Sequence, residues 1–320
     1  MTIVRQDGRL GNSIALVIPA YNEELTIGDT IDSFLKQIPS ATLVVVDNNS
    51  TDKTAQIAGA KILAVNNKGR VIREPRQGKA MALRKAFSEI VADFYVVVDA
   101  DDTYPAEAVH EMISRCLDGA DMVVGDRHSS GAYRDTNRRL FHGFGNGLVT
   151  WIINTLFRSR LRDIMSGYRV LSRKFVKNFP IMSSGFEIET EMTLHALDKR
   201  FMVEEIPVNY RVRGSENPSK LNTFSDGFRV LKAIFWIFKD FRPLIFFLSC
   251  ALLFFIGGVA SGFPVIAEFI VTRKILHIPL AILATGLMLF SIIFLTIGIV
   301  LDTVAEFQRF NYELKLLSDE

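Results

Sequence analysis

The segment VVVDADD, which ends at Asp102, places three aspartates directly after a strongly apolar run. Asp99 and Asp101 alternate, so both carboxylates can reach one hard cation once the chain turns. Oxygen ligands of this kind bind Mg²⁺ or Mn²⁺, which is commonly shared with the phosphates of a substrate. The plainer alternative is an acidic turn in which Asp102 or Thr103 caps a helix that begins at Pro105.

Two further acidic segments follow apolar runs. VIPAYNEE (17–24) and VVVDNNSTDKT (44–54) each pass from a candidate strand into a candidate helix. Taken singly, both are strand-to-helix turns with suitable capping residues. Together with Asp99 and Asp101, they predict carboxylates at three successive strand ends on one edge of a sheet. Such an accumulation of negative charge needs a cation or hydrogen-bond donors to offset its repulsion, and a nucleotide bound with a metal ion supplies both.

The elements that must position these residues are short apolar runs, which alternate with helical patterns through the first 125 residues. Because the runs are rich in Val and Ile and contain few polar residues, they are typical of strands buried on both faces. Their order predicts an α/β fold with a Rossmann-like, mainly parallel sheet that binds ligands at its carboxyl edge. We expect strands at 14–18, 42–47, 61–65, 94–100 and 121–125, and helices near 22–37, 51–59, 78–91 and 105–117.

Beyond residue 125 the chain becomes strongly basic. The segment 127–177 contains 11 basic and 2 acidic residues, whereas the whole chain has a net charge of +2. A local charge of +9 predicts an anionic ligand. Phosphates, lipid head groups and nucleic acid all fit at this point, and a solvated basic face is the plainer alternative. We expect a polar loop at 127–137, helices near 138–157 and 186–199, and strands near 168–171 and 202–210.

The C-terminal part contains two long stretches without a charged residue, 243–267 and 275–301. Each exceeds the ~20 residues with which a helix crosses a bilayer. We therefore expect a hairpin of two transmembrane helices within 243–302, followed by a tail at 303–320. Because neither span contains an ionisable residue, a transport path through the pair is not expected.

The residues around these spans predict their orientation. Six Lys and Arg residues flank the outer ends and two lie in the link, so the positive-inside rule places the N-terminal domain and both termini in the cytoplasm. The start of the chain contains no signal-peptide core. An aromatic face opposite a cationic face at 223–242 predicts an amphipathic juxtamembrane helix at the lipid surface, with packing on the soluble domain as the alternative. Cys116 and Cys250 are too few and too far apart to indicate a disulfide framework or a metal site.

Several further motifs follow the acidic segments in a fixed order. They are Gly78-Lys79 before a helix, GDR (125–127), Arg138-Arg139, RDIMSGYR (162–169), GFEIETEM (185–192), EIPVNYRVR (205–213) and PSKLN (218–222). This series resembles family two of the inverting glycosyltransferases, which have the GT-A fold. With two spans behind it, the series is similar to the polyprenyl-phosphate type, which includes dolichol-phosphate mannose synthases and undecaprenyl-phosphate glucosyltransferases. The resemblance implies a cytoplasmic GT-A domain at 1–222.

The resemblance also implies roles for individual residues. It implies that a nucleotide-sugar donor is bound by Pro19, Tyr21, Glu23, Asp47, Lys79, Asp99, Ala100 and Asp101. It implies that the acceptor phosphate and the donor diphosphate are bound by Arg127, Arg138, Arg139, Ser166, Arg169, Arg211, Arg213 and Lys220. Asp99 and Asp101 would hold Mg²⁺ or Mn²⁺, and with Arg127 and Asp163 they form the expected catalytic set. Thr103 stands where the mannose synthases often have Gln, and because a hydroxyl is a poorer ligand we do not expect it to touch the metal.

The chemistry of the expected acceptor bears on Asp163. A polyprenyl monophosphate has a second pKa of about 6 and is therefore largely dianionic at pH 7, so it is already a nucleophile. Its main need is to approach a second polyanion, which the basic segment and the metal make easier. An anion beside that phosphate is unfavourable, so we expect Asp163 to orient arginines, with a general base as the alternative. Glu187 and Glu189 could bond to sugar hydroxyls or pair with a nearby Arg.

These observations predict a metal-dependent enzyme that transfers one sugar, with inversion, to polyprenyl phosphate at the cytoplasmic membrane face. Because the two-span arrangement resembles the bacterial glucosyl enzymes more closely, the resemblance favours a UDP-hexose donor, with glucose or N-acetylglucosamine, and a GDP-mannose-dependent dolichol-phosphate mannose synthase is the alternative. A processive polysaccharide synthase is disfavoured because neither Trp151 nor Trp236 lies in a Gln-x-x-Arg-Trp segment. From another class, a catalytically silent, membrane-tethered scaffold that binds nucleotide sugar stays open. Nucleic acid is not an expected partner of a chain with a membrane anchor, and a homo-oligomer is possible.

Overall fold

The computed structural model describes residues 13–65, 68–129, 140–182, 188–211 and 241–318, together with residues 235, 237 and 239. The chain forms two compact units, divided after Asp226. Most of the expected juxtamembrane helix at 223–242 lies outside the described residues.

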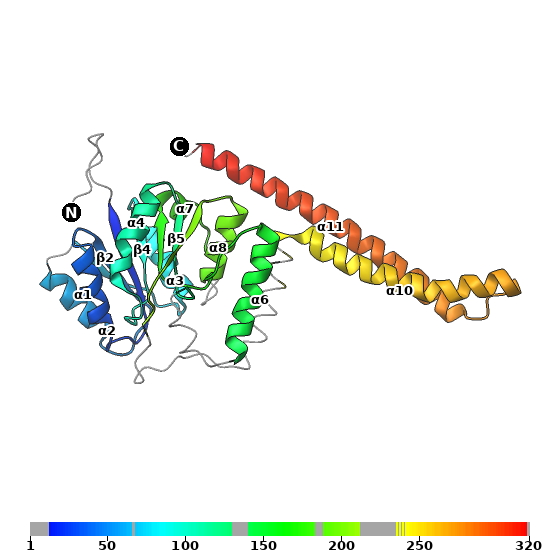
Figure 1. Cartoon of the computed structure of the whole chain (residues 1–320), viewed down its shortest axis with the longest axis horizontal. Coiled ribbons are helices and arrows are strands. Elements are labelled where there is room, and N and C mark those ends of the chain that lie inside the picture. Colours follow the sequence, from blue (N-terminus) through cyan, green and yellow to red (C-terminus); the bar gives the residue numbers. More distant parts are fainter. Residues whose placement is uncertain are drawn as a thin grey trace. The chain divides into compact units, whose positions relative to one another are not determined.

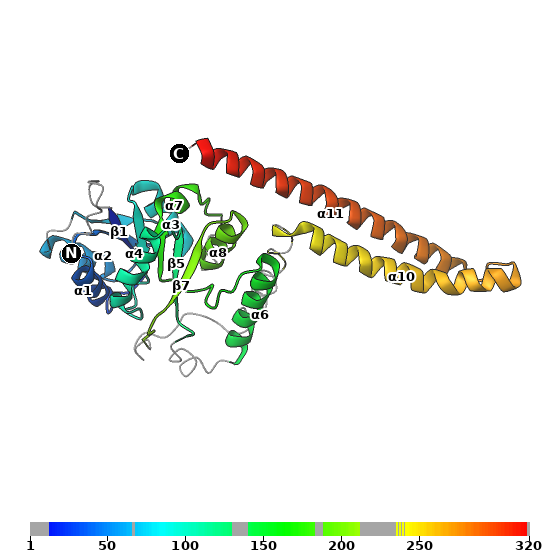
Figure 2. The same cartoon turned by 45° about the horizontal axis from the view of Figure 1, so that its top comes forward.

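The first unit is built on one sheet of seven strands. The strands are β1 (Ile14–Ala20), β2 (Thr42–Asp47), β3 (Arg70–Arg73), β4 (Phe94–Val97), β5 (Met122–Asp126), β6 (Arg169–Ser172) and β7 (Val203–Pro207). Their order is β3-β2-β1-β4-β6-β5-β7, and Figure 2 shows β7 beside β5. β6 runs antiparallel to both of its neighbours, whereas all other pairs are parallel. The expected mainly parallel α/β sheet is therefore confirmed.

Helices cover both faces of this sheet (Figure 1). The helices of this unit are α1 (Ile27–Gln37), α2 (Thr54–Ala64), α3 (Lys79–Glu89), α4 (Val109–Leu117) after a short 3-10 turn η1 (Ala106–Ala108), α6 (Leu140–Phe157), α7 (Arg173–Asn178) and α8 (Ile188–Asp198). Of these, α6 packs on α8. On one face Ile31 of α1 and Met112 of α4 join Leu16 and Val96 in a single buried core. On the other face α3 packs through Phe87, whose ring meets that of Tyr95 edge to face at 5.8 Å. The strands are thus buried on both sides, which explains their continuous apolar sequence.

The expected strand at 61–65 is wrong. Residues up to Ala64 continue α2, and the strand that follows is β3 at Arg70–Arg73. Ala58 and Ile62 are one helical turn apart and both are buried, while Leu63 is 82% exposed. The apolar residues at 61–65 therefore belong to the end of an alanine-rich helix, which packs on the protein through one side only. The described end of β4 at Val97 also lies earlier than the expected 94–100.

The reversed direction of β6 determines what lies at the carboxyl edge of the sheet. Residues after β4 and β5 lie at this edge because those strands end there. Because β6 runs the opposite way, the residues that precede it, 162–168, lie at the same edge. Segments that are far apart in the chain are thereby brought together.

The second unit contains two long helices, α10 (Pro243–Thr272) and α11 (Ile278–Ser318). Both are long and apolar enough to cross a membrane, with mean hydropathy values of 2.4 and 2.5 over the most apolar 18 residues of each, which indicates that the chain associates with one. They pack on each other where Gly258 faces Met288 and where Ser291 Oγ donates a hydrogen bond of 2.9 Å to the carbonyl oxygen of Ala251. The expected tail at 303–320 continues α11 as far as Ser318.

Candidate active site

The acidic segment after β4 meets a buried lysine. Asp99 pairs with Nζ of Lys79, the first residue of α3. The same ammonium group pairs at 2.5 Å with Oε1 of Glu189 on α8, and the side chains of Lys79 and Glu189 are only 9% and 7% exposed. Burial alone would lower the pKa of Lys79, but the two carboxylates outweigh burial and raise that pKa above its usual range. Lys79 is therefore positively charged at neutral pH.

Asp101 is oriented by its neighbour Thr103. The Thr103 hydroxyl is buried and donates a hydrogen bond of 2.6 Å to Oδ1 of Asp101. This hydrogen bond holds the Asp101 carboxylate in one orientation. Between them Asp102 has a positive φ of 52°, and its Oδ2 lies 3.8 Å from Nη1 of the exposed Arg211.

The expected donor residues lie at the carboxyl ends of β1 and β2. Pro19 is in β1, where its missing N–H costs no ladder bond to β4, because that pairing stops at Val17. Tyr21 follows β1 and is half-buried, and Asp47 ends β2 and accepts a hydrogen bond of 3.1 Å from the backbone N–H of Ser50.

A threonine joins this donor side to the acidic segment. The hydroxyl of Thr26 lies 3.1 Å from Oε2 of Glu23 and 2.8 Å from the carbonyl oxygen of Ala100. Three of the expected donor residues, Glu23, Ala100 and Asp101, thus belong to one connected edge.

Asn48 is a positioning residue that the sequence did not single out. Its amide nitrogen donates to the carbonyl oxygens of Glu74 and Arg76 at 3.2 and 2.7 Å, and its Oδ1 accepts from the N–H of Gly78 at 2.7 Å. Gly78 has a φ of 131°, which a side chain rarely adopts, and it leads directly into Lys79. Asn48 therefore fixes the turn that presents Lys79. Its only sequence signal was its place directly after Asp47.

Gly167 touches the carboxylate of Asp99. A Cβ built at this glycine would overlap Oδ2 of Asp99 and lie 2.8 Å from both Cγ of Asp99 and Nζ of Lys79. The N–H of Gly167 donates a hydrogen bond of 2.9 Å to the buried hydroxyl of Tyr104. The loop before β6 is therefore pressed against the acidic segment and cannot withdraw without breaking this bond.

Gly167→Ala is expected to lower activity at least about a hundredfold, because a misplacement near 1 Å in an active site can cost this much. The added methyl must push Asp99 or Lys79 aside. Gly147→Ala on α6 is the matched control, since nothing lies within 4 Å of its Cβ position. Initial rates of both variants, compared with their melting temperatures, check this prediction. Equal rates for Gly167→Ala and the unchanged protein would show that the close approach has no importance for the reaction.

Arg127 and Asp163 form a two-pronged ion pair. Nε and Nη2 of Arg127 donate to the two oxygens of Asp163 at 2.7 and 2.9 Å, and the N–H of Arg127 adds a third bond of 3.1 Å. The side chain of Asp163 is 1% exposed. Burial raises the pKa of Asp163, but the bonds from Arg127 outweigh this effect and hold the pKa below its ordinary value. A carboxylate held in this way is a weak base at neutral pH.

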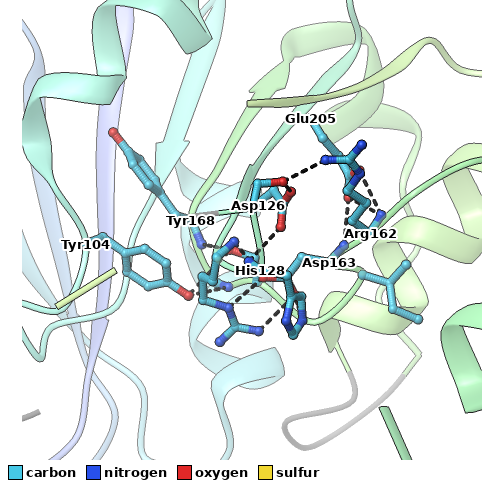
Figure 3. A network of polar contacts seen from close by, with 12 residues as sticks. Tyr104, Asp126, His128, Arg162, Asp163, Tyr168 and Glu205 are labelled. Atoms are coloured by element: carbon cyan, nitrogen blue, oxygen red, sulfur yellow. Dashed lines mark hydrogen bonds and ion pairs between the residues drawn. The ribbon is translucent and has the colours of Figure 1, made fainter. Parts of the chain in front are cut away.

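A second carboxylate holds the loop that carries Asp163. The backbone N–H groups of Arg162 and Asp163 both donate to Oε1 of Glu205, at 2.9 and 2.8 Å. Figure 3 shows this contact beside Asp126, which ends β5 and accepts a hydrogen bond of 2.7 Å from the N–H of His128. Burial raises the pKa of Glu205. Strands β5 and β7 thus fix the two loops whose side chains form the ion pair.

Two tyrosines connect the aspartates with Arg127. The ring of Tyr210 lies 5.6 Å from the guanidinium carbon of Arg127 and 5.2 Å from the ring of Tyr104. The backbone N–H of Arg211, the residue after Tyr210, donates a hydrogen bond of 2.8 Å to the carbonyl oxygen of Thr103. Asp101 is therefore connected to the cation through Thr103 and the segment that carries Tyr210, and both halves of the expected site share one edge of the sheet.

The structure corrects the expectation for Arg169 and Ser166. Both are completely buried. The guanidinium of Arg169 donates to the carbonyl oxygens of Ser166 and Ile164 at 2.9 and 2.7 Å and to the hydroxyl of Thr193 at 3.0 Å, and burial lowers its pKa to about 10. Arg169 therefore holds the loop before β6 in place and is not available to an acceptor phosphate. The expected site residues Arg138, Arg139, Arg213 and Lys220 lie outside the described residues.

The donor atoms at the acidic edge fit a shared metal. Over the described ranges no group of three His, Cys, Asp or Glu side chains is arranged to hold a metal ion. Asp99 and Asp101 offer two half-buried carboxylates. Mg²⁺ is usually bound in proteins by one or two carboxylates, with substrate phosphates and water as its other ligands. The pair thus suits a metal that arrives with a diphosphate.

The sheet order with its reversed β6 and the acidic edge after β4 define a GT-A fold. A family model described as Glycosyl transferase family 2 matches residues 15–179, just over half of the chain. The chain belongs to this family and is a glycosyltransferase.

Relatives match along most of the chain. Glycosyltransferase AglJ of Haloferax volcanii is 28% identical over 302 residues, which are 93% of this chain and 95% of the relative. A dolichyl-phosphate hexose transferase of the same organism is 29% identical over 223 residues, 70% of this chain and 92% of the relative. Among solved structures, glucosyl-3-phosphoglycerate synthase of Mycobacterium tuberculosis with Mn²⁺, uridine diphosphate and phosphoglyceric acid aligns with a TM-score of 0.54 and 22% identity. The alignment covers 72% of this chain and 78% of that one, and this likeness establishes the fold alone.

Proposed function

We propose that the chain transfers one sugar, with inversion, from a nucleotide-sugar donor to a polyprenyl phosphate. The observation that carries the proposal is the connection of Asp101 to Arg127 at one sheet edge, through Thr103 and the segment that carries Tyr210. The edge offers carboxylates to a metal on one side and a guanidinium to an anion on the other. Two long apolar helices and the relative named dolichyl-phosphate hexose transferase support a lipid acceptor.

The donor side would bind the nucleotide sugar at the ends of β1, β2 and β4. Asp99 and Asp101 would hold Mg²⁺ or Mn²⁺, which supplies charge neutralisation for the departing nucleoside diphosphate. Tyr21 and Glu23, which follow β1, and Asp47, which ends β2, would contact the base and the ribose. A UDP-hexose donor, with glucose or N-acetylglucosamine, remains our preferred choice.

The acceptor side would bind the lipid phosphate at Arg127. A phosphate oxygen attacks the anomeric carbon, a new carbon–oxygen bond forms, and the bond to the diphosphate breaks on the opposite face. Because the phosphate is largely dianionic at pH 7, no proton has to be removed. The lowered pKa of Asp163 and its bonds to Arg127 support an orienting role for this carboxylate. In this proposal α10 and α11 cross the membrane, and the glycosyltransferase unit lies in the cytoplasm.

The proposal is tested by incubating the full chain in lipid nanodiscs with labelled nucleotide sugars and a polyprenyl phosphate. UDP-glucose, UDP-N-acetylglucosamine and GDP-mannose are offered in parallel, each with and without EDTA. A labelled lipid that forms with one donor, and only with metal, is the expected result. Labelled product with GDP-mannose alone would change the donor assignment. Binding of a donor without any turnover would favour the silent scaffold and overturn the proposal.

A further inference from the structure

Lys79 occupies an unusual place between two acidic groups. Its ammonium group bridges Asp99, which follows β4, and Glu189, which belongs to α8. These two carboxylates belong to segments far apart in the sequence, and the side chains of Lys79 and Glu189 are nearly closed to solvent. Gly167 lies directly against the contact.

Charge explains why a lysine is found there. Asp99, Asp101 and Glu189 place three carboxylates near one sheet edge, and without a cation they would repel one another. Lys79 balances one of these charges inside the fold. Its ammonium group lies between Asp99 and Glu189, and among the described residues no three carboxylates are arranged to hold a metal ion.

We infer that Lys79 is a resident cation which competes with a divalent metal for Asp99 and is anchored in that position by Glu189. The inference rests on the proposed function, in which Asp99 and Asp101 hold the metal. Lys79 lowers the affinity of the empty site for metal, because the metal must share Asp99 with an ammonium group of like charge. Metal then binds strongly only when a donor diphosphate contributes further oxygen ligands.

The inference predicts opposite effects for the two partners of one ion pair. Lys79→Met removes the competing cation, so the dissociation constant of Mn²⁺ in the absence of donor is expected to fall about tenfold. Glu189→Gln removes the anchor and one negative charge, so Lys79 pairs with Asp99 alone and the dissociation constant is expected to rise several-fold. A merely structural pair would lose stability in both variants without this reversal of sign.

Mn²⁺ binding is measured by electron paramagnetic resonance on the full chain in nanodiscs, without nucleotide sugar. Lys85→Met is the matched control, because Lys85 lies on the same helix and pairs with Glu89 at the surface. It should change the constant less than twofold. Asp101→Ala identifies the signal of the proposed site, and melting temperatures verify that each variant is folded.

Tighter Mn²⁺ binding by Lys79→Met and weaker binding by Glu189→Gln support the inference. If the unchanged protein binds Mn²⁺ at Asp101 and neither variant shifts the constant in its expected direction, the inference is overturned while the metal site stands. If Lys79→Met does not fold, Glu189→Gln decides alone. If no Mn²⁺ binds even with donor present, the proposed metal site fails and the inference fails with it.

Discussion

Asp101→Ala is expected to reduce kcat at least about a thousandfold while the protein stays folded. The substitution removes one of the two carboxylates that would hold the metal, so a shared metal would lose half of its proposed protein ligands. The structural cost is small, because Asp101 is half-buried and accepts hydrogen bonds of 2.6 and 3.4 Å from the hydroxyl and the N–H of its neighbour Thr103. Losing one such acceptor costs about 1 kcal/mol, which lowers the melting temperature by ~2–4 °C in a unit of this size.

Asp118→Ala is the control for Asp101→Ala, since it removes the same charge at the exposed end of α4. Rates are measured at saturating donor and over a range of Mn²⁺ concentrations. Full loss of activity at every Mn²⁺ concentration, with Asp118→Ala unaffected, is the expected pattern. Near-normal rates for Asp101→Ala would show that the metal assignment is wrong.

Asp163→Asn is expected to lower both stability and activity. An amide offers one oxygen and places an NH₂ group against a donor of Arg127, so the buried guanidinium loses much of its partner. Breaking a buried ion pair from one side costs about 3–5 kcal/mol, and the retained oxygen of Asn places the effect at about the lower end. Activity should fall about ten- to a hundredfold, because Arg127 is no longer held in one orientation.

The pH dependence separates an orienting role of Asp163 from a general base. If the phosphate is its own nucleophile, the pH–rate profile of Asp163→Asn keeps the shape of the unchanged protein. Loss of a titration on the acidic limb would assign Asp163 as the base. A double variant, Arg127→Met with Asp163→Leu, should recover part of the lost stability without recovering activity.

The stability of the ion pair has its own pH signature. The pKa of Asp163 lies below the ordinary value of 3.8, so folding favours its charged form. This contribution is present above about pH 4 and is lost as the pH falls through the folded pKa. The difference in melting temperature between the unchanged protein and Asp163→Asn is therefore expected to be constant from about pH 5 to 8 and to shrink below pH 4. A gap that persists unchanged at pH 3 would show that the pKa is not lowered.

The sequence predicted the strands that are buried on both faces, because Val and Ile runs in β1, β2, β4 and β5 leave few other choices. It failed at 61–65, where an apolar run was too short to distinguish a buried strand from one side of a helix. The short edge strand β3 has the sequence RVIR, and its two arginines interrupt the apolar run by which the other strands were predicted. The strand order of β5 and β6 is set by long-range pairing that no local pattern encodes.

Site residues were predicted where a strand end decides the position and missed where a partner lies far away in the chain. Asp99 and Asp101 belong to the first kind. Glu189 had been expected to meet a sugar or an Arg, yet its partner is Lys79, on a helix that covers the same face of the sheet. Arg169 follows Ser166 and Gly167 closely, but only the fold decides that its side chain turns inward while the glycine meets Asp99.

The reversed strand β6 has an evolutionary consequence. In the proposed function the sugar nucleotide is chosen by turns that leave β1, β2 and β4, whereas the lipid phosphate is met by loops that leave β5 and enter β6. These two groups of loops occupy separate stretches of the gene and meet only after folding. Recombination or drift in one stretch can therefore exchange the acceptor while the other stretch continues to select the same donor.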